Sequence, residues 1–164
     1  MKIPLQMSAA GERDIVITRS FEAPRELVFR AWCEPALVTR WMFGPPGWSF
    51  AVCDIDFRVG GRYRFVWRHE DGREMGMGGR YVDIVAPERI VTTELFDQDW
   101  TGGETIGTLV FTEEAGKTHT TYTLTYASPA ARDMVMKSGM TSGMEAGYER
   151  LDAIFAESAK TAGR

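Results

Sequence analysis

Hydrophobic and polar residues alternate along much of the chain, which is the pattern of β-strands that bury one face. Residues 14–21 alternate in this way and predict a first strand. Six further runs have the same character, and short turns that contain Gly or Pro separate most of them. They cover residues 48–57, 62–69, 74–85, 89–96, 105–113 and 118–127. Because short turns connect neighbouring antiparallel strands, we expect a meander.

Helical spacing of apolar residues marks two short segments between the first strand and the others. Pro24 precedes the first segment, and proline is tolerated at the start of a helix because its missing N–H would have no partner there. Pro35 begins the second segment, and the rigid loop 44–47 follows it. The pattern therefore predicts two short helices after the first strand.

A third helical segment closes the chain and is predicted to run without interruption from residue 129 to about residue 158. Gly139, Gly143 and Gly147 recur every four residues beside its apolar face. Glycine in a helix interior costs roughly 1 kcal/mol relative to alanine, so we expect the backbone to approach the sheet or a ligand closely at these positions. The order of elements predicts an α+β fold: a curved antiparallel sheet of about seven strands wraps around the long C-terminal helix, with two short helices after the first strand.

Length and composition fit a single domain. The chain has 164 residues, and we expect residues 1–12 to form a flexible leader and residues 13–160 to form the domain. No apolar stretch is long enough to span a membrane, and two cysteines without secretory context favour a cytoplasmic protein. We expect it to be a monomer or a homodimer. A formal net charge of -4 argues against nucleic acid as a partner. Two His and two Cys leave little room for a metal site, so we expect no metal and no cofactor.

Five stretches of the sequence carry a family resemblance. They are ITRSFEAPRELVFRAWCEP (17–35), TRWMFGPPGW (39–48), CDIDFRVGGRYRF (53–65), VAPERIV (85–91) and KSGMTSGMEAGYERLDAIF (137–155). In this order they resemble the family of heat shock protein 90 ATPase activator homologues, in the START-like (SRPBCC) superfamily that also includes polyketide cyclases. The resemblance implies a helix-grip fold, in which the sheet and the long helix enclose an apolar cavity. It also suggests a chaperone as a partner. The five stretches contain no catalytic constellation, so the resemblance indicates the fold more than an activity.

Aromatic and Met side chains on the strands and on the last helix are the candidates for lining such a cavity. Met is flexible and suits irregular pockets, and aromatic rings suit planar ligands. The predicted cavity residues are Trp41, Trp48, Phe50, Tyr63, Phe65, Trp67, Met75, Met77, Tyr81, Met136, Met140 and Met144. The same side chains could instead form a plain hydrophobic core. The row of glycines favours a cavity, since it removes side-chain volume where the helix faces the sheet.

Only two residues are candidates for acid–base chemistry. His69 ends an inward-facing row of residues on the third strand and could move protons near neutral pH. The alternative is a strand-end histidine bonded to solvent or backbone. Glu94 lies in an otherwise apolar strand, where burial would raise the pKa of its carboxyl. No Ser or Cys lies beside a histidine in the sequence, so nucleophilic catalysis has no support.

These observations lead to three functional hypotheses. The first is binding of a small hydrophobic or aromatic molecule, such as a lipid or polyketide, with Tyr81, His69 or Glu94 orienting its polar group. Such binding could serve stress response or secondary metabolism. The second is a cyclase, hydrolase or isomerase that acts on such a molecule, which requires an acid or base inside the cavity. The third is a co-chaperone that activates a chaperone ATPase. The scarcity of reactive groups favours binding over catalysis.

Overall fold

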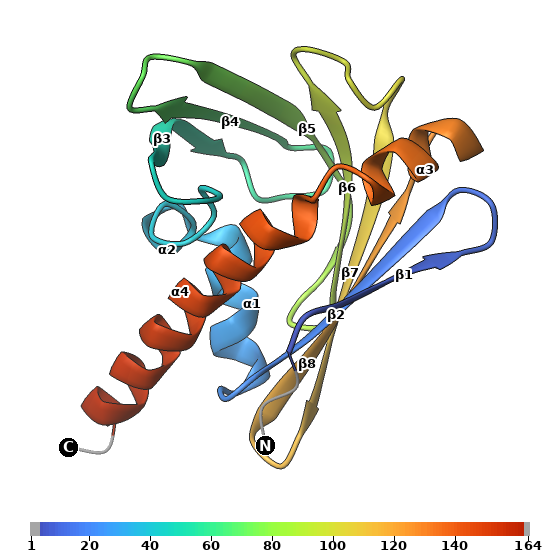
Figure 1. The fold of residues 1–164 in the computed structure, drawn as a ribbon. Coiled ribbons are helices and arrows are strands. Elements are labelled where there is room, and N and C mark those ends of the chain that lie inside the picture. The colour runs from blue at the N-terminus through green and yellow to red at the C-terminus, as the bar shows by residue number, and fades with distance from the viewer. Residues whose placement is uncertain (1–3, 163–164) are drawn as a thin grey trace.

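Among residues 4–162, which the computed structural model describes, eight strands form one antiparallel sheet (Figure 1). They are β1 (Gln6–Ala10), β2 (Asp14–Phe21), β3 (Trp48–Ile55), β4 (Arg62–His69), β5 (Glu74–Val85), β6 (Arg89–Phe96), β7 (Thr105–Glu114) and β8 (Lys117–Thr125). Their order in the sheet is β1-β2-β8-β7-β6-β5-β4-β3. The strands β3 to β8 therefore form the predicted meander, and β2 pairs with β8 at its end.

The alternating sequence pattern folds as expected in the strands that face the interior. In β2, buried and half-buried residues alternate along the whole strand, with Ile15, Ile17, Arg19 and Phe21 on the buried side. The bounds of β4, β5 and β6 are those that the pattern predicts. Local alternation is enough to define these strands because each buries one face and leaves the other near solvent.

Four helices of the described chain lie on the same side of the sheet or at its end (Figure 1). They are α1 (Arg25–Cys33), α2 (Pro35–Val38), α3 (Pro129–Met136) and α4 (Met140–Ala162). The first two connect β2 to β3, as predicted, and the last two follow β8. Val28 and Phe29 of α1 share a core cluster with Leu151 and Phe155 of α4 and with residues of the strands. The result is the predicted α+β helix-grip fold.

The prediction of one uninterrupted C-terminal helix is wrong, because the helix breaks between α3 and α4. The Ser128 hydroxyl caps α3 by accepting the backbone N–H of Ala131 at 3.1 Å, and Lys137 ends the helix. Gly139 has a φ of +75°, in the left-handed region that interrupts helical geometry and that glycine adopts without a Cβ penalty. The first glycine of the predicted row therefore provides a break, and α3 is displaced from the axis of α4.

The prediction of a flexible leader over residues 1–12 is also corrected. Residues 6–10 form β1, which pairs antiparallel with β2 and raises the strand number to eight from the expected seven. Met7 of this strand packs against a second core cluster, which Ile15 and Val135 help to form. Backbone pairing with β2 supplies the order that the short side chains of this segment do not indicate. Residues 1–3 lie outside the described residues.

A buried ion-pair cluster fixes α4 to the sheet. Arg19 of β2 is 1% exposed, and its guanidinium donates to Asp152 at 2.7 Å and to Glu145 at 3.2 Å, both on α4. The guanidinium carbon also lies 5.0 Å from the ring centre of Phe21 and 5.8 Å from that of Tyr148. Breaking a buried pair leaves an uncompensated charge and costs about 3–5 kcal/mol. The cluster therefore holds α4 against β2.

Candidate functional site

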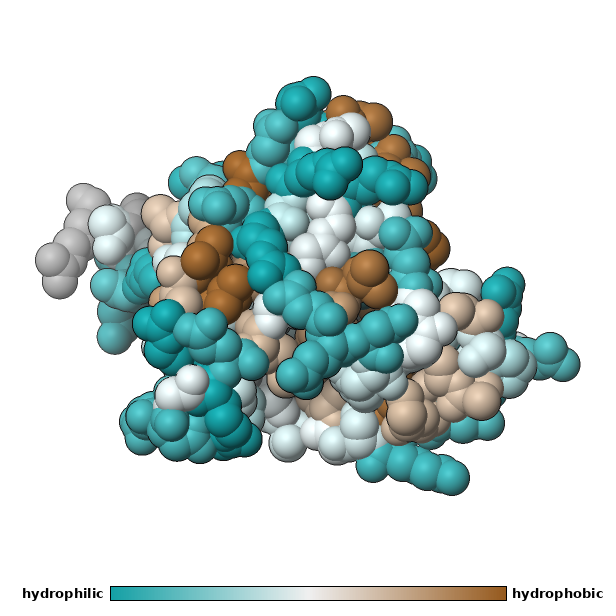
Figure 2. Space-filling view, turned by 90° about the horizontal axis from the view of Figure 1, so that it is seen from above, coloured by the Kyte–Doolittle hydropathy of each residue, from teal (hydrophilic) through white to brown (hydrophobic). Residues whose placement is uncertain are grey.

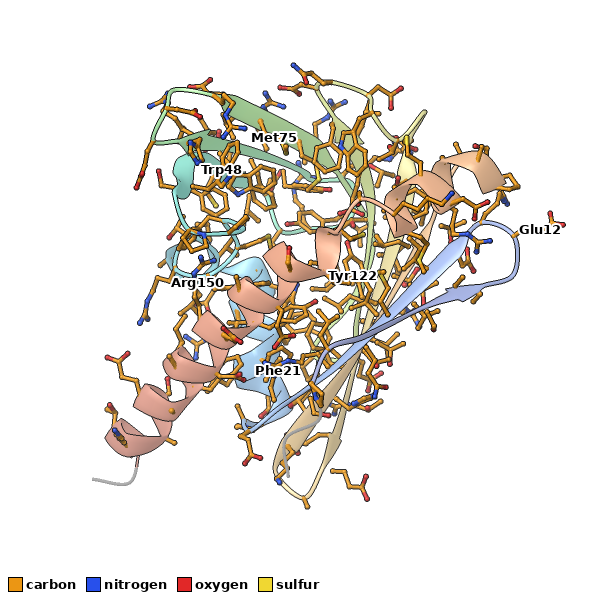
Figure 3. The ribbon with its side chains drawn as sticks, in the orientation of Figure 1. Glu12, Phe21, Trp48, Met75, Tyr122 and Arg150 are labelled. Atoms are coloured by element: carbon orange, nitrogen blue, oxygen red, sulfur yellow. The ribbon has the colours of Figure 1, made fainter. Side chains whose placement is uncertain are left out.

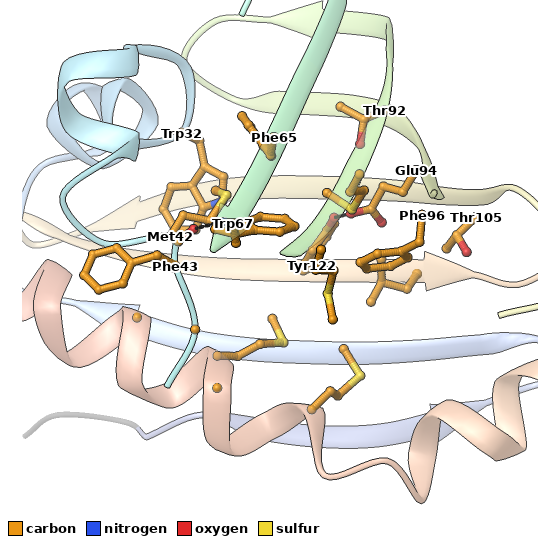
Figure 4. Close-up of a pocket in the computed structure, with 18 of the residues that line it drawn as sticks. Trp32, Met42, Phe43, Phe65, Trp67, Thr92, Glu94, Phe96, Thr105 and Tyr122 are labelled. Carbon is orange, nitrogen blue, oxygen red and sulfur yellow. Dashed lines mark hydrogen bonds between the residues drawn. The ribbon is translucent and has the colours of Figure 1, made fainter. Parts of the chain in front are cut away.

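A cavity of about 540 Å³ lies between the sheet and α4. Thirty residues line it, and thirteen of these are aromatic. They come from every strand from β3 to β8 and from α1, the loop after α2, α3 and α4. The volume falls within the roughly 300–1,000 Å³ of sites that hold small molecules. The interior is therefore not filled by its own Met and Trp side chains, although these form much of its wall (Figure 4).

Two lining residues mark where the cavity meets the surface. Met75 of β5 is 45% exposed, and Trp100, in the loop between β6 and β7, is 39% exposed. Figure 3 places Met75 on β5, at the end of the molecule opposite to the two chain termini. Viewed from that end, the surface is mainly polar, with separate apolar groups between the charged side chains (Figure 2). The cavity therefore reaches the surface near Met75 and Trp100.

Glu94 and Tyr122 form a polar site in the wall of the cavity (Figure 4). Glu94 projects from β6 and Tyr122 from β8, and the Tyr122 hydroxyl donates to Glu94 Oε1 at 3.0 Å. The strand β7 lies between them, and a Cβ on its Gly107 would lie 2.8 Å from the Tyr122 hydroxyl oxygen. Because Gly107 has no side chain, a tyrosine two strands away can reach the carboxyl group.

The surroundings of Glu94 change its acidity. Burial among apolar groups raises the pKa of its carboxyl from 4.5 to about 7, and the hydrogen bond from Tyr122 acts in the opposite direction because it favours the ionised form. Glu94 is half-buried, and since it lines the cavity, its accessible part faces the cavity space. No Lys, Arg or His is among the described residues that line the cavity. The carboxyl therefore gains or loses a proton near neutral pH without a cationic side chain in the same wall.

Other groups that could react are held in their protonated forms. The Tyr63 hydroxyl donates to the carbonyl oxygen of Thr93 at 2.6 Å, and burial raises the pKa of Tyr63. Burial also raises the pKa of the Cys33 thiol to about 11 and raises that of Cys53, and neither cysteine forms a disulfide. Since the thiolate is the nucleophile, neither cysteine is an activated one.

Residues 4–162 contain neither a metal-ligand cluster nor a membrane-spanning helix. Within this range, no group of three or more His, Cys, Asp or Glu side chains is arranged to hold a metal ion. No helix in the same range is long and apolar enough to cross a membrane.

The two remaining glycines of the predicted row face the loop after α2, which forms part of the wall opposite the sheet. Trp32 of α1 and Trp41 pack edge to face with ring centres 4.7 Å apart, and the Trp41 indole donates to a backbone carbonyl of α1 at 2.8 Å. A Cβ on Gly147 of α4 would lie 3.1 Å from the carbonyl oxygen of Trp41, and one on Gly143 would lie 3.4 Å from Pro45. Close approach is present at Gly147, whereas Gly143 has room for an ordinary contact, and the neighbour is the loop after α2 rather than the expected sheet or ligand.

Most of the residues predicted for the cavity do line it. The lining includes Trp41, Trp48, Tyr63, Phe65, Trp67, Met75, Met77, Tyr81, Met140 and Met144. Glu94 lines it too, together with Thr92 and Phe96 on the same face of β6. That these residues contact a ligand remains a prediction.

Three predicted residues lie elsewhere. Phe50 packs behind the wall, with its ring centre 5.6 Å from that of Phe65 and 5.7 Å from that of Trp67. Met136 packs against the second core cluster, because the break between α3 and α4 moves it off the face that faces the cavity. His69 is outside the lining, and its Nδ1 accepts a backbone N–H two residues further on at 3.2 Å. The alternative of a strand-end histidine bonded to backbone therefore describes His69.

Sequence reasoning missed Tyr122 and Gly107, which complete the polar site. Tyr122 lies between threonines in β8, where alternation alone gives it no special role. Gly107 offered a usable signal, since an isolated glycine in the β-branched run of β7 indicates that another group approaches closely. The identity of that group depends on the pairing of β6, β7 and β8.

The fold and the cavity define a START-like helix-grip protein. Residues 22–156 match the family model described as "Activator of Hsp90 ATPase homolog 1-like protein", and the chain belongs to this family. No curated protein matches the sequence significantly. The family assignment agrees with the resemblance carried by the five sequence stretches.

Solved structures with the same fold come from several bacteria. A protein from Rhodobacter sphaeroides is 34% identical, with a TM-score of 0.89 over 94% of this chain and 99% of that chain. A protein from Mycobacterium smegmatis is 24% identical, with a TM-score of 0.80 over 92% of this chain and 96% of that one. An AHSA1-like protein from Aeromonas hydrophila is 21% identical, with a TM-score of 0.67 over 85% and 93% of the two chains. The last two show the fold alone.

Proposed function

We propose that the chain binds a small, largely apolar or aromatic molecule in the cavity between the sheet and α4. The family fold supports a ligand-binding role in general. The observation that carries the more specific proposal is a cavity of about 540 Å³ whose wall is mostly aromatic and apolar. Burial of apolar ligand surface there would contribute about 25 cal/mol per Å².

Within this proposal, the lining residues have different roles. The aromatic and Met side chains supply apolar contact area, and the flexible Met140 and Met144 of α4 can adapt to the shape of the ligand. Glu94 and Tyr122 offer hydrogen-bonding groups that fix the orientation of the polar end of the ligand. His69, which lies outside the cavity, has no part in the site.

A thermal-shift screen against lipids, flavonoids and polyketides tests the proposal. A ligand that binds the folded state raises Tm, and the shift grows with ligand concentration. Met144→Trp places a large ring in the cavity and should weaken binding of each hit at least tenfold. Met134→Trp is the matched control, because Met134 is exposed on α3 and outside the cavity lining. The proposal fails if no ligand raises Tm or if Met144→Trp binds the hits as tightly as the control.

A second candidate function is acid–base catalysis on the bound molecule, favoured by the carboxyl of Glu94 inside the cavity. Its pKa of about 7 suits proton transfer at neutral pH, because both the acid and the base form are populated. Ionised Glu94 would take a proton from one atom of the ligand, and protonated Glu94 would return it to another atom. Such an isomerisation balances without a cofactor.

Deuterium exchange distinguishes this candidate from simple binding. A ligand from the screen is incubated with the protein in D₂O, and mass spectrometry follows deuterium uptake and any isomer formed. Catalysis predicts uptake that Glu94→Gln abolishes while binding persists. Binding without uptake in the wild type rejects the enzyme candidate and leaves the binding proposal standing.

The hypothesis of a chaperone partner rests on the family description alone. It predicts that the purified chain raises the ATPase rate of an Hsp90 chaperone, and an unchanged rate rejects it. We also propose that the protein acts in the cytoplasm, where its two free cysteines would stay reduced. Both proposals are independent of the cavity.

A further inference from the structure

The charges around the cavity do not balance within the described residues. Glu94 is the only Asp or Glu in the lining, and no Lys, Arg or His lines the wall with it. Elsewhere this chain compensates the charge that it buries: Arg19 is 1% exposed and pairs with Asp152 and Glu145. An ionised carboxyl in apolar surroundings is costly unless a cation compensates it. At Glu94, therefore, either the carboxyl stays protonated or a compensating cation comes from outside the described residues.

The hydrogen bonds of Glu94 leave room for a donor. Tyr122 bonds to Oε1 at 3.0 Å, and among residues 4–162 no other hydrogen bond reaches this carboxyl. An ionised carboxylate has two oxygens and can accept several hydrogen bonds. The second oxygen can therefore accept an N–H from a molecule in the cavity.

The rings near Glu94 suit a positive charge as well. Phe96 lies two residues along the same face of β6, and its ring centre is 5.6 Å from that of Trp100. Tyr63 and Tyr126 are close enough for the charge of Glu94 to raise the pKa of each phenol. The faces of aromatic rings attract cations, and this attraction strengthens when water is excluded.

From the lone carboxyl, its unused oxygen and the surrounding rings, we propose that the ligand is a protonated amine on an apolar or aromatic body, whose ammonium group lies against Glu94. This inference rests on the proposed binding function and adds the chemical class of the ligand. The N–H would bond to the free oxygen of Glu94, and the body would fill the space among the aromatic rings. A neutral ligand that accepts a hydrogen bond from a protonated Glu94 is the competing outcome.

The assignment has a consequence for the acidity of Glu94. A cation beside the carboxyl favours its ionised form, so binding of an amine should lower the pKa of Glu94 from about 7 and release a proton near neutral pH. The titratable groups that face Glu94 are Tyr122 of β8, Tyr63 of β4 and Tyr126 after β8. Burial raises the pKa of all three phenols, so none of them titrates near neutral pH.

Matched pairs of amines and alcohols test the proposal. Isothermal titration calorimetry at pH 7.5 compares phenethylamine with phenethyl alcohol, 2-(2-naphthyl)ethylamine with 2-(2-naphthyl)ethanol, and dodecylamine with dodecanol. We expect the better-binding pair to show at least a tenfold preference for the amine. The preference should disappear in Glu94→Gln, which keeps the shape of the side chain and loses its charge. It should persist in Glu88→Gln, the control, which removes an exposed carboxylate outside the cavity.

The outcomes separate this inference from the binding proposal. If the alcohols bind as tightly as the amines, or if the preference survives in Glu94→Gln, the ligand class is wrong and the binding function stands. If no member of any pair binds and the thermal-shift screen also fails, both proposals fail. Glu94→Asp keeps the charge on a shorter side chain, so it should retain part of the preference for amines.

Discussion

Glu94→Gln should change how the stability of the ligand-free protein depends on pH. The pKa of Glu94 is raised to about 7 in the folded protein, whereas the ordinary value of 4.5 applies to the unfolded chain. Between these values the folded state binds more protons than the unfolded state, so the free energy of unfolding falls as pH rises. The contribution of protonated Glu94 is fully present below about pH 4.5 and is lost as pH rises through about 7. The amide in Glu94→Gln has no such titration.

The size of the effect follows from the two pKa values. At about 1.4 kcal/mol per pKa unit, the change from 4.5 to about 7 corresponds to roughly 3 kcal/mol. Roughly 2 kcal/mol of this falls between about pH 5 and pH 8. Over that range the wild type should therefore lose roughly 2 kcal/mol more stability than Glu94→Gln.

Urea unfolding followed by circular dichroism measures this difference at a series of pH values. The contributions of all other titrating groups cancel when wild type and Glu94→Gln are compared at each pH. Glu88→Gln is again the control, and its stability should run parallel to that of the wild type. Parallel curves for wild type and Glu94→Gln would refute the argument that folding desolvates Glu94.

Three further predictions concern the groups around the cavity. Tyr122→Phe removes the donor that favours ionised Glu94, so the pKa of Glu94 should rise above about 7 in an NMR titration of its carboxyl carbon. Asp152→Ala leaves Arg19 buried with one fewer partner and should lower the free energy of unfolding by about 3 kcal/mol, measured with urea. Gly139→Ala places a Cβ on a residue with a φ of +75° and should cost about 1–2 kcal/mol in the same assay.

Each of these variants has a control or a contrary outcome. Glu157→Ala removes the exposed partner of Arg40 and should cost about 0–1 kcal/mol, so an equal cost at Asp152 would reject the anchoring role of the buried pair. Gly143→Ala meets Pro45 at 3.4 Å and should gain up to about 1 kcal/mol of helix stability. If Gly143→Ala cost as much stability as Gly139→Ala, the positive φ of Gly139 would not explain the cost at that position. A lower pKa of Glu94 in Tyr122→Phe would contradict the role of the hydroxyl.

The sequence predicted the fold to the extent that each element depends on its own residues. In β4, alternation along the strand was enough to identify Tyr63, Phe65 and Trp67 as residues of one face, and all three line the cavity. The same reasoning failed for Met136, because helical spacing counted through Gly139 assumes a continuous axis. It failed for residues 6–10 because an edge strand can form through backbone pairing without a distinctive side-chain pattern.

The sequence by itself therefore determined the family, the meander, the short helices and most of the aromatic and Met residues of the wall. It also identified Glu94 as an acid in an apolar strand, since the period of a strand is a local property. Only the tertiary structure decided that the Tyr122 hydroxyl reaches Glu94 across Gly107. It also decided that, among residues 4–162, no Lys, Arg or His lines the cavity with Glu94. Those facts depend on how distant strands pair, and pairing is fixed by packing of the whole sheet. Burial in that wall, which only the folded chain reveals, is what raises the pKa of Glu94.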